Sequence, residues 1–213
     1  YATLKRFVDE NAALFGHTSE AVAQGVRVMR EDVAAHNGMR SVVWQQEVDG
    51  VPLYNTILRA SLTKSGELVT VGSHFVSEAE KATQLSAAER AALVQQPPLD
   101  LGKAVAAAAA NVDTAVDVGA VRSVSQPEGA ERRQRLEAPG LSDVNAGLAW
   151  LPMSSNKLSL VWDVTLMSLQ QREMFRVLVD AKSGEVLVRT SLTSDLSEAS
   201  YRVHANTVTR KPL

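Results

Sequence analysis

The sequence predicts an α+β protein of two modules, each an antiparallel sheet packed by a helix. Over most of the chain apolar residues alternate with polar ones, which is the period of a half-buried strand. Tight-turn signals such as Asp49-Gly50 separate these alternating stretches, as expected of hairpins. Helical spacing is confined to a few segments, and one of them precedes the strands of each half.

The first module begins with a predicted helix. Apolar residues recur at near-helical spacing from Leu4 to Phe15, and Gly16 suits the left-handed position after a helix end. Val26, Val28 and Met29 then lead through charged residues to the Asn37-Gly38 turn, and the period changes to two only after that turn.

Three strands follow as a predicted antiparallel meander. The first alternates from Val42 to Val48 and ends at Asp49-Gly50, a strong hairpin signal. The second runs from Val51 to about Leu62, and the third occupies residues 69–75 after a turn at residues 64–66.

Helix signals mark the middle of the chain. Ser86 and Glu89 have the spacing of a capping box, and Pro97-Pro98 ends the helix that they begin. Asp100 is a predicted N-cap for a second, alanine-rich helix whose inner stripe is Leu101, Val105, Ala108 and Val112. Residues 125–145 are polar and contain two prolines, so we expect a loop there.

Strands resume after this loop and complete the second module. Residues 147–151 form one predicted strand, and Leu158 to Leu166 alternate strictly enough to be the clearest strand in the chain. Residues 175–179 and 186–188 form two more strands around a turn at residues 182–184. The chain therefore divides into a module at residues 1–80, a linker helix at 81–98, a module at 99–193 and a tail at 194–213.

An internal repeat supports two similar modules. Trp44 and Trp162 are 118 residues apart, and the Lys-Ser-Gly-Glu turns at residues 64–67 and 182–185 have the same offset. We expect both halves to place a tryptophan strand and this turn at equivalent positions. Each tryptophan lies in register with apolar neighbours, which favours core packing over a ligand-stacking platform.

Composition excludes several classes of function. The 213 residues carry a net charge of −2, without the surplus of cations that nucleic-acid binding requires. There is no cysteine, so disulfides and thiolate chemistry are absent, and no run of 18 apolar residues predicts a membrane span. We expect neither a nucleic-acid partner nor a cofactor.

Familiar catalytic patterns are also missing. The four histidines have no His-Glu-x-x-His spacing, and we interpret His17, His36 and His74 as surface or capping residues. Asp163 and Asp180 resemble a carboxylate pair, but Asp163 is expected on the outward face of its strand and Asp180 in a turn. The arginines at 132, 133 and 135 lie among glutamates, which favours a solvated loop over an anion site.

Several stretches resemble the prosegment of fungalysin-type metalloproteases. The run from Met39 to Tyr54, with its central Gln46 and the Gly50-Val51-Pro52 hairpin, resembles the fungalysin/thermolysin propeptide module. The stretches at residues 160–164 and 179–187 resemble a PepSY-like module, so the resemblance implies two helix-plus-sheet modules of the PepSY or cystatin-like kind.

The resemblance implies the prodomain of a secreted zinc metalloprotease, which assists folding and covers the active site until it is removed. The chain itself would be no enzyme and would hold no metal. Its partner would be the cognate catalytic domain, reached through the tail. The expected protease contacts are Gly50, Val51, Pro52, Tyr54, Tyr201, Arg202 and Val203.

Two other hypotheses stay open. The chain is alternatively a non-inhibitory scaffold or binding module of a larger surface protein that uses the same fold. An enzyme with an unrecognised site is the third hypothesis, which the missing motifs disfavour.

Overall fold

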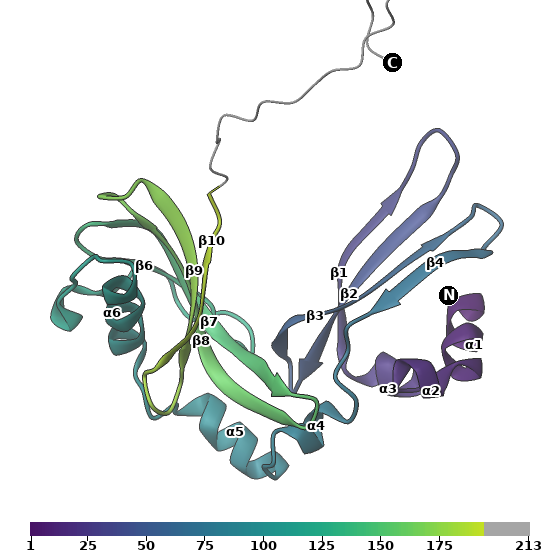
Figure 1. Ribbon diagram of the computed structural model, residues 1–213, viewed down its shortest axis with the longest axis horizontal. Coiled ribbons are helices and arrows are strands. Elements are labelled where there is room, and N and C mark those ends of the chain that lie inside the picture. Colours follow the sequence, from purple (N-terminus) through teal and green to yellow (C-terminus); the bar gives the residue numbers. More distant parts are fainter. Residues whose placement is uncertain (194–213) are drawn as a thin grey trace, which may run out of the picture.

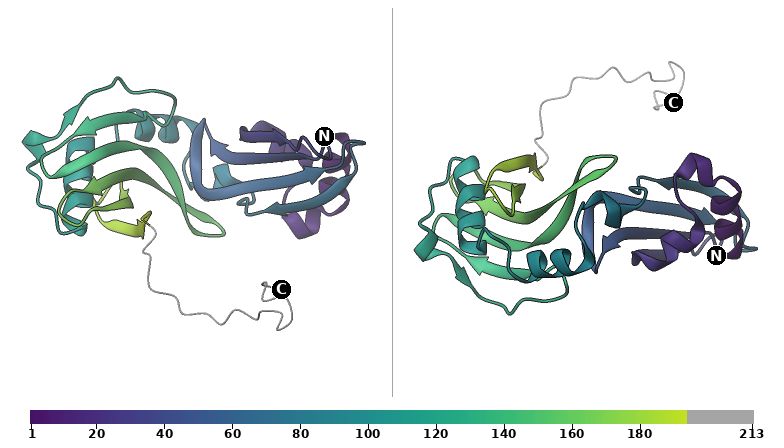
Figure 2. Two further views of the ribbon diagram at one scale, coloured as in Figure 1. Left: turned by 90° about the horizontal axis from the view of Figure 1, so that it is seen from above. Right: turned by 90° about the horizontal axis from the view of Figure 1, so that it is seen from below.

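The computed structural model describes residues 1–193 as two sheets that diverge in a V, with helices on the outer sides and at the base (Figure 1). The first half contains three short helices and four strands, which are α1 Ala2–Glu10, α2 Ala12–Phe15, α3 Ser19–Gln24, β1 Val26–Val33, β2 Arg40–Val48, β3 Val51–Leu62 and β4 Leu68–Ser73. Views from above and below place the two sheets end to end (Figure 2).

The second half begins with helices at the base of the V. Its elements are α4 Ala79–Ala82, α5 Ala87–Gln95, α6 Leu101–Asn111, the 3₁₀ turn η1 Val118–Ala120, β5 Arg122–Ser123, β6 Gln134–Glu137, β7 Leu141–Ser154, β8 Lys157–Ser168, β9 Glu173–Asp180 and β10 Val186–Ser191. Helix α6 packs on the outer face of β7 to β10, on the side away from the first half (Figure 1).

The strands confirm the predicted α+β class and its antiparallel meanders. The strand order across the two sheets is β1-β2-β3-β7-β8-β9-β10, with β4 also paired to β3. One residue pair, Leu53 with Trp150, is parallel, and it joins β3 of the first half to β7 of the second. The remaining strand pairs of the described chain are antiparallel.

The repeat occupies equivalent positions in the two halves. Trp44 lies on β2 and Trp162 on β8, and in each half a middle strand and then the Lys-Ser-Gly-Glu turn follow. Gly66 and Gly184 in these turns have φ angles of +86° and +79°, a left-handed conformation that glycine adopts without strain. Both tryptophans are buried as predicted, with 8% and 2% of their surface exposed.

Helix caps form as the sequence indicates. The Ser86 hydroxyl accepts a bond from the Glu89 backbone N–H at 3.3 Å, and the Glu89 carboxylate accepts from the Ser86 N–H at 2.7 Å. These bonds satisfy orphan donors at the start of α5. The Ser86 hydroxyl also donates to the Glu89 carboxylate at 2.7 Å, and this bond and the one from the Ser86 N–H lower the pKa of Glu89. Asp100 caps α6 by accepting from the Lys103 N–H at 2.9 Å, and its pKa is lowered by that bond.

Two segments differ from the sequence prediction. Residues 26–33 form a strand, β1, although nearly all of its residues are exposed and no alternation of burial marks it. The predicted loop at 125–145 contains β6 and the start of β7. In β6 the buried positions are Gln134 and Leu136. Because one of the two buried residues is polar, the apolar residues of this strand do not alternate, and the sequence pattern did not predict it.

The hydrophobic core has two main clusters. The smaller one packs α1, through Leu4 and Val8, against Trp44 and Leu58. The larger one packs α6 against the second sheet, and it also contains Val48, Val51 and Leu53 of the first half. The β2–β3 hairpin therefore belongs to the core of the other half of the chain.

Gln46, the central glutamine of the hallmark run, has a structural role. Its side-chain amide donates to the Val76 carbonyl at 2.8 Å, and its side-chain oxygen accepts from the Val76 N–H at 2.8 Å. The two bonds hold the segment after β4 against β2.

We expect Gln46→Ala to lower the free energy of unfolding by ~1–2 kcal/mol, because it leaves both backbone groups of the half-buried Val76 without these partners. Urea unfolding measures this, and Gln126→Ala, at an exposed loop position, is the matched control. Equal stabilities of the two variants would contradict this role of Gln46.

Candidate protein-binding site

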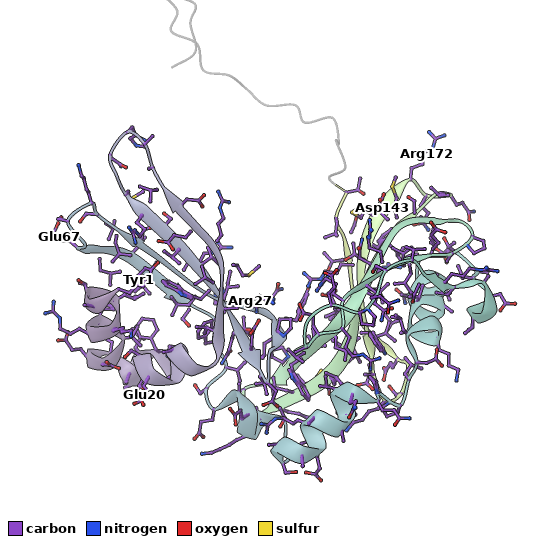
Figure 3. The ribbon with its side chains drawn as sticks, turned by 180° about the vertical axis from the view of Figure 1, so that it is seen from behind. Tyr1, Glu20, Arg27, Glu67, Asp143 and Arg172 are labelled. Carbon is purple, nitrogen blue, oxygen red and sulfur yellow. The ribbon has the colours of Figure 1, made fainter. Side chains whose placement is uncertain are left out.

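The candidate site consists of the two sheet faces that carry no helix. Helices α1 to α3 cover one side of the first sheet and α6 covers one side of the second, and the other faces look toward each other across the V (Figure 1). Arg27, on β1, lies at the base between them, whereas Arg172 lies at the far tip of the second sheet (Figure 3). We call these two surfaces the inner faces.

The β2–β3 hairpin forms the joint at the base of the V. Asp49 and Gly50 turn the chain with φ angles of 52° and 78°, and a side chain at Gly50 would lie 3.0 Å from Ala130 of the second half. Val51 is fully buried, with 0% of its surface exposed. The hairpin is thus packed between the two halves of the chain.

Arg90 of α5 fixes this hairpin in place. Its side chain is 6% exposed and forms two bonds to the Asp49 carboxylate, at 2.6 and 3.2 Å. A third bond, at 3.2 Å, reaches the Leu85 carbonyl. Because a buried guanidinium requires partners for its donors, Asp49 anchors the joint as much as Arg90 does.

A second group of charges crosses the joint at the inner side. Arg27 Nε lies 3.0 Å from Glu47 Oε1, and Arg27 Nη1 lies 3.5 Å from Glu131 Oε1. Glu131 belongs to the second half and is buried. Burial raises the pKa of Glu47, Arg27 opposes that shift, and the Glu131 carboxylate adds to it.

The inner face of the second sheet holds a buried ion pair. Asp163 is 3% exposed and its carboxylate accepts two bonds from Arg176, at 2.8 and 2.6 Å. The Arg176 guanidinium lies 4.6 Å from the ring centre of Tyr54, a cation–π contact between the halves. Asp163 points away from α6 as predicted, but it is buried because Arg176 covers it.

The predicted contact residues fall into three groups. Gly50, Pro52 and Tyr54 are partly exposed at the joint, whereas Val51 has no exposed surface and supports the hairpin from within. Tyr201, Arg202 and Val203 lie outside the described residues. Contact of these residues with a protease stays a prediction.

Ion-pair residues of the joint carry no sequence signal. Arg90 and Asp49 are 41 positions apart, and Arg27 and Glu131 are 104 apart. Arg132, expected in a solvated loop, donates to the Gln95 carbonyl at 2.6 Å and so satisfies the end of α5. Only the topology brings these residues together.

Two small cavities border the first sheet. One of about 280 Å³ lies between His17, the end of β2 and residues 78–81, and one of about 210 Å³ lies between α1 and Trp44. Within residues 1–193, no three His, Asp or Glu side chains are close enough together to hold a metal ion. No helix of that part of the chain is long and apolar enough to cross a membrane.

A helix-backed antiparallel meander with an open inner face defines the class of module in each half. Residues 24–75, which include all of β1 to β4, match the family described as the Fungalysin/Thermolysin Propeptide Motif. The chain therefore carries a protease-propeptide motif of the thermolysin and fungalysin type. No curated protein sequence matches the chain significantly.

One solved structure resembles the chain weakly. It is described as the Bacillus megaterium YpeB C-terminal domain, and the alignment covers 80% of this chain with 10% identity and a TM-score of 0.39. The chain spans 58% of the length of that structure. A similarity at this level carries no argument about function.

The joint predicts an unequal response to two similar substitutions. Asp49→Asn leaves the buried Arg90 without a carboxylate at its two strongest bonds, so we expect a loss of ~1–3 kcal/mol in unfolding free energy. Asp32→Asn breaks an exposed pair with Arg30 and should cost less than ~0.5 kcal/mol. Urea titration of both variants measures the difference, and equal losses would contradict the anchoring role of Asp49.

Glu47 predicts a pH-dependent effect. A carboxyl whose pKa is raised by folding destabilises the folded chain above its ordinary pKa, and the penalty disappears below that value. Glu47→Gln should therefore gain stability relative to the wild type as the pH rises from the ordinary range of glutamate toward neutrality. Thermal unfolding across this range measures it, with the exposed Glu185→Gln as a control for the loss of one charge. A difference that does not change with pH would contradict this role.

Proposed function

We propose that this chain is the prodomain of a secreted zinc metalloprotease, and that it acts as an intramolecular chaperone and active-site inhibitor until it is removed. The observation that carries the proposal is the propeptide motif at residues 24–75. Secretion follows from the same motif, because propeptides of this type belong to secreted proteases. The predicted PepSY-like character of residues 99–193 extends the prodomain over the second half.

The geometry supports this proposal in two ways. The inner faces offer two strand surfaces without covering helices, at an angle that receives a convex partner (Figure 1). The joint is held by core packing and by the Asp49–Arg90 pair, so the angle between the faces is maintained before a partner binds. A preformed surface lowers the entropy cost of association, and a template for folding requires the same property.

Inhibition by a prodomain needs surface complementarity and no catalytic residue. A typical stable interface buries about 1,600 Å² in total. The tail residues Tyr201 and Val203 are apolar in a polar stretch, and we propose that they dock as an extended strand. Gly50, Pro52 and Tyr54 would meet the partner at the base of the V.

The test adds the purified chain to the mature metalloprotease encoded by the same gene and follows peptide cleavage. We expect inhibition, and faster refolding of the denatured protease when the chain is present. Tyr201→Ala and Val203→Asp should weaken inhibition at an unchanged melting temperature. Leu14→Ala, which removes a side chain that is 80% exposed on the outer side, is the control.

Three results would contradict the proposal. They are the absence of such a protease from the gene, no inhibition at any soluble concentration, and normal refolding of the protease without the chain. The last two together would favour the alternative, a non-inhibitory scaffold or binding module of a larger surface protein.

A further inference from the structure

A polar row crosses the inner face of the second sheet. The strand registers place Arg135, Asn145, Thr165, Arg176 and Thr190 side by side on five successive strands. Their sequence neighbours Ala146, Val164 and Val177 are buried in the core against α6, so the row lies on the opposite face. The two ends of this row, Arg135 and Thr190, are exposed.

A matching row crosses the inner face of the first sheet. Arg30, Val43, Arg59 and Gly72 are paired across β1 to β4, while Val42 and Ala60 face the helices. A side chain at Gly72 would meet nothing within 4 Å, so Arg59 has open space beside it. Each inner face thus carries two arginines in one cross-strand row.

The two rows share an electrostatic pattern. In each row one arginine is neutralised within the chain, Arg30 by Asp32 and Arg176 by Asp163. Within residues 1–193 the other arginine, Arg59 or Arg135, has neither an ion pair nor a side-chain hydrogen bond. Glu137, next on the same face as Arg135, stands in register with Arg122 on β5. Each row therefore presents one arginine that the described part of the chain leaves without a side-chain partner.

We propose that Arg59 and Arg135 are the two electrostatic contacts by which the inner faces dock an acidic surface of the catalytic domain. This inference rests on the proposed function and adds the chemistry of the partner. Guanidinium groups fit carboxylates through paired, parallel hydrogen bonds, which gives such contacts a defined geometry. Placed on opposite inner faces, the two arginines require carboxylates on two sides of one convex body.

A nucleic acid fits this pattern less well than an acidic protein surface. The chain has a net charge of −2, and carboxylates stand beside the arginines in both rows, which would repel a continuous phosphate backbone. Isolated cations among neutral polar residues instead suit a protein interface, where charge complementarity raises the association rate and fixes orientation.

The experiment measures the inhibition constant of the full chain toward the mature protease, as wild type and as Arg59→Glu, Arg135→Glu and the double variant. We expect each single reversal to weaken inhibition about tenfold and the double variant about a hundredfold, because like charges then face each other. Wild-type inhibition should also weaken between 50 and 500 mM salt, roughly tenfold, as exposed charges are screened.

Two matched controls separate contact from net charge. Arg6 is part of α1, on the outer side of the first sheet, and Arg172 lies at the tip of the second sheet (Figure 3). The control variants are Arg6→Glu and Arg172→Glu. Both reverse one exposed arginine and should leave the inhibition constant within about twofold of the wild type. If a charge reversal lowers the melting temperature, Arg59→Gln and Arg135→Gln replace it, because they remove the charge without reversing it.

The outcomes distinguish the two proposals. A wild-type chain that fails to inhibit would overturn the proposed function, and this inference with it. Inhibition by the wild type that the double reversal leaves unchanged would overturn the electrostatic contacts alone. An equal loss with Arg6→Glu would also overturn them, because net charge would then explain the effect. Tighter binding of single-stranded DNA than of the protease would assign the rows to a nucleic acid instead.

Discussion

Burial of the β2–β3 hairpin between the two halves is the constraint on which the rest of the structure depends. The side chains of three residues at the ends of β2 and β3 pack into the core that α6 forms with the second sheet. They are Val48, Val51 and Leu53. Full burial of a side chain of this size contributes ~1.5–3 kcal/mol, so these three residues are a large part of what joins the halves. The parallel ladder adds one residue pair, and packing rather than backbone pairing therefore sets the angle of the V.

Polar groups at the joint follow from that packing. A hairpin that enters a core brings its turn residues with it, and here it brings the exposed carboxylate of Asp49 to a cation of α5. Arg90 provides that cation and is itself buried by the same contact. Arg27, Glu47 and Glu131 form a comparable group on the inner side, where burial raises the pKa of Glu47 in spite of the nearby Arg27. The joint thus combines buried apolar side chains of the hairpin with ion pairs that link the two halves of the chain.

The sequence predicts the regular parts of this structure because their signals are local. Alternation identified β2, β3, β8 and β9, and the caps at Ser86 and Asp100 lie within four residues of the groups that they satisfy. The sequence did not predict β1 or β6. β1 is an exposed edge strand without alternating apolar residues, and in β6 one of the two buried positions is the polar Gln134. The sequence did not predict the joint either. Burial of the Gly50-Val51-Pro52 turn depends on contacts with the second sheet, which is distant in the sequence.

The exposure of β1 has a consequence for behaviour at high concentration. An edge strand offers unpaired backbone groups to any neighbouring chain, and Val28, Met29 and Val33 add exposed apolar surface to this one. The register of β1 slips between Val28 and Arg30, and three of the next residues are charged. A bulge and a cluster of charges interrupt the flat ladder that intermolecular strand pairing requires, so the chain resists edge-to-edge aggregation at the strand most exposed to it.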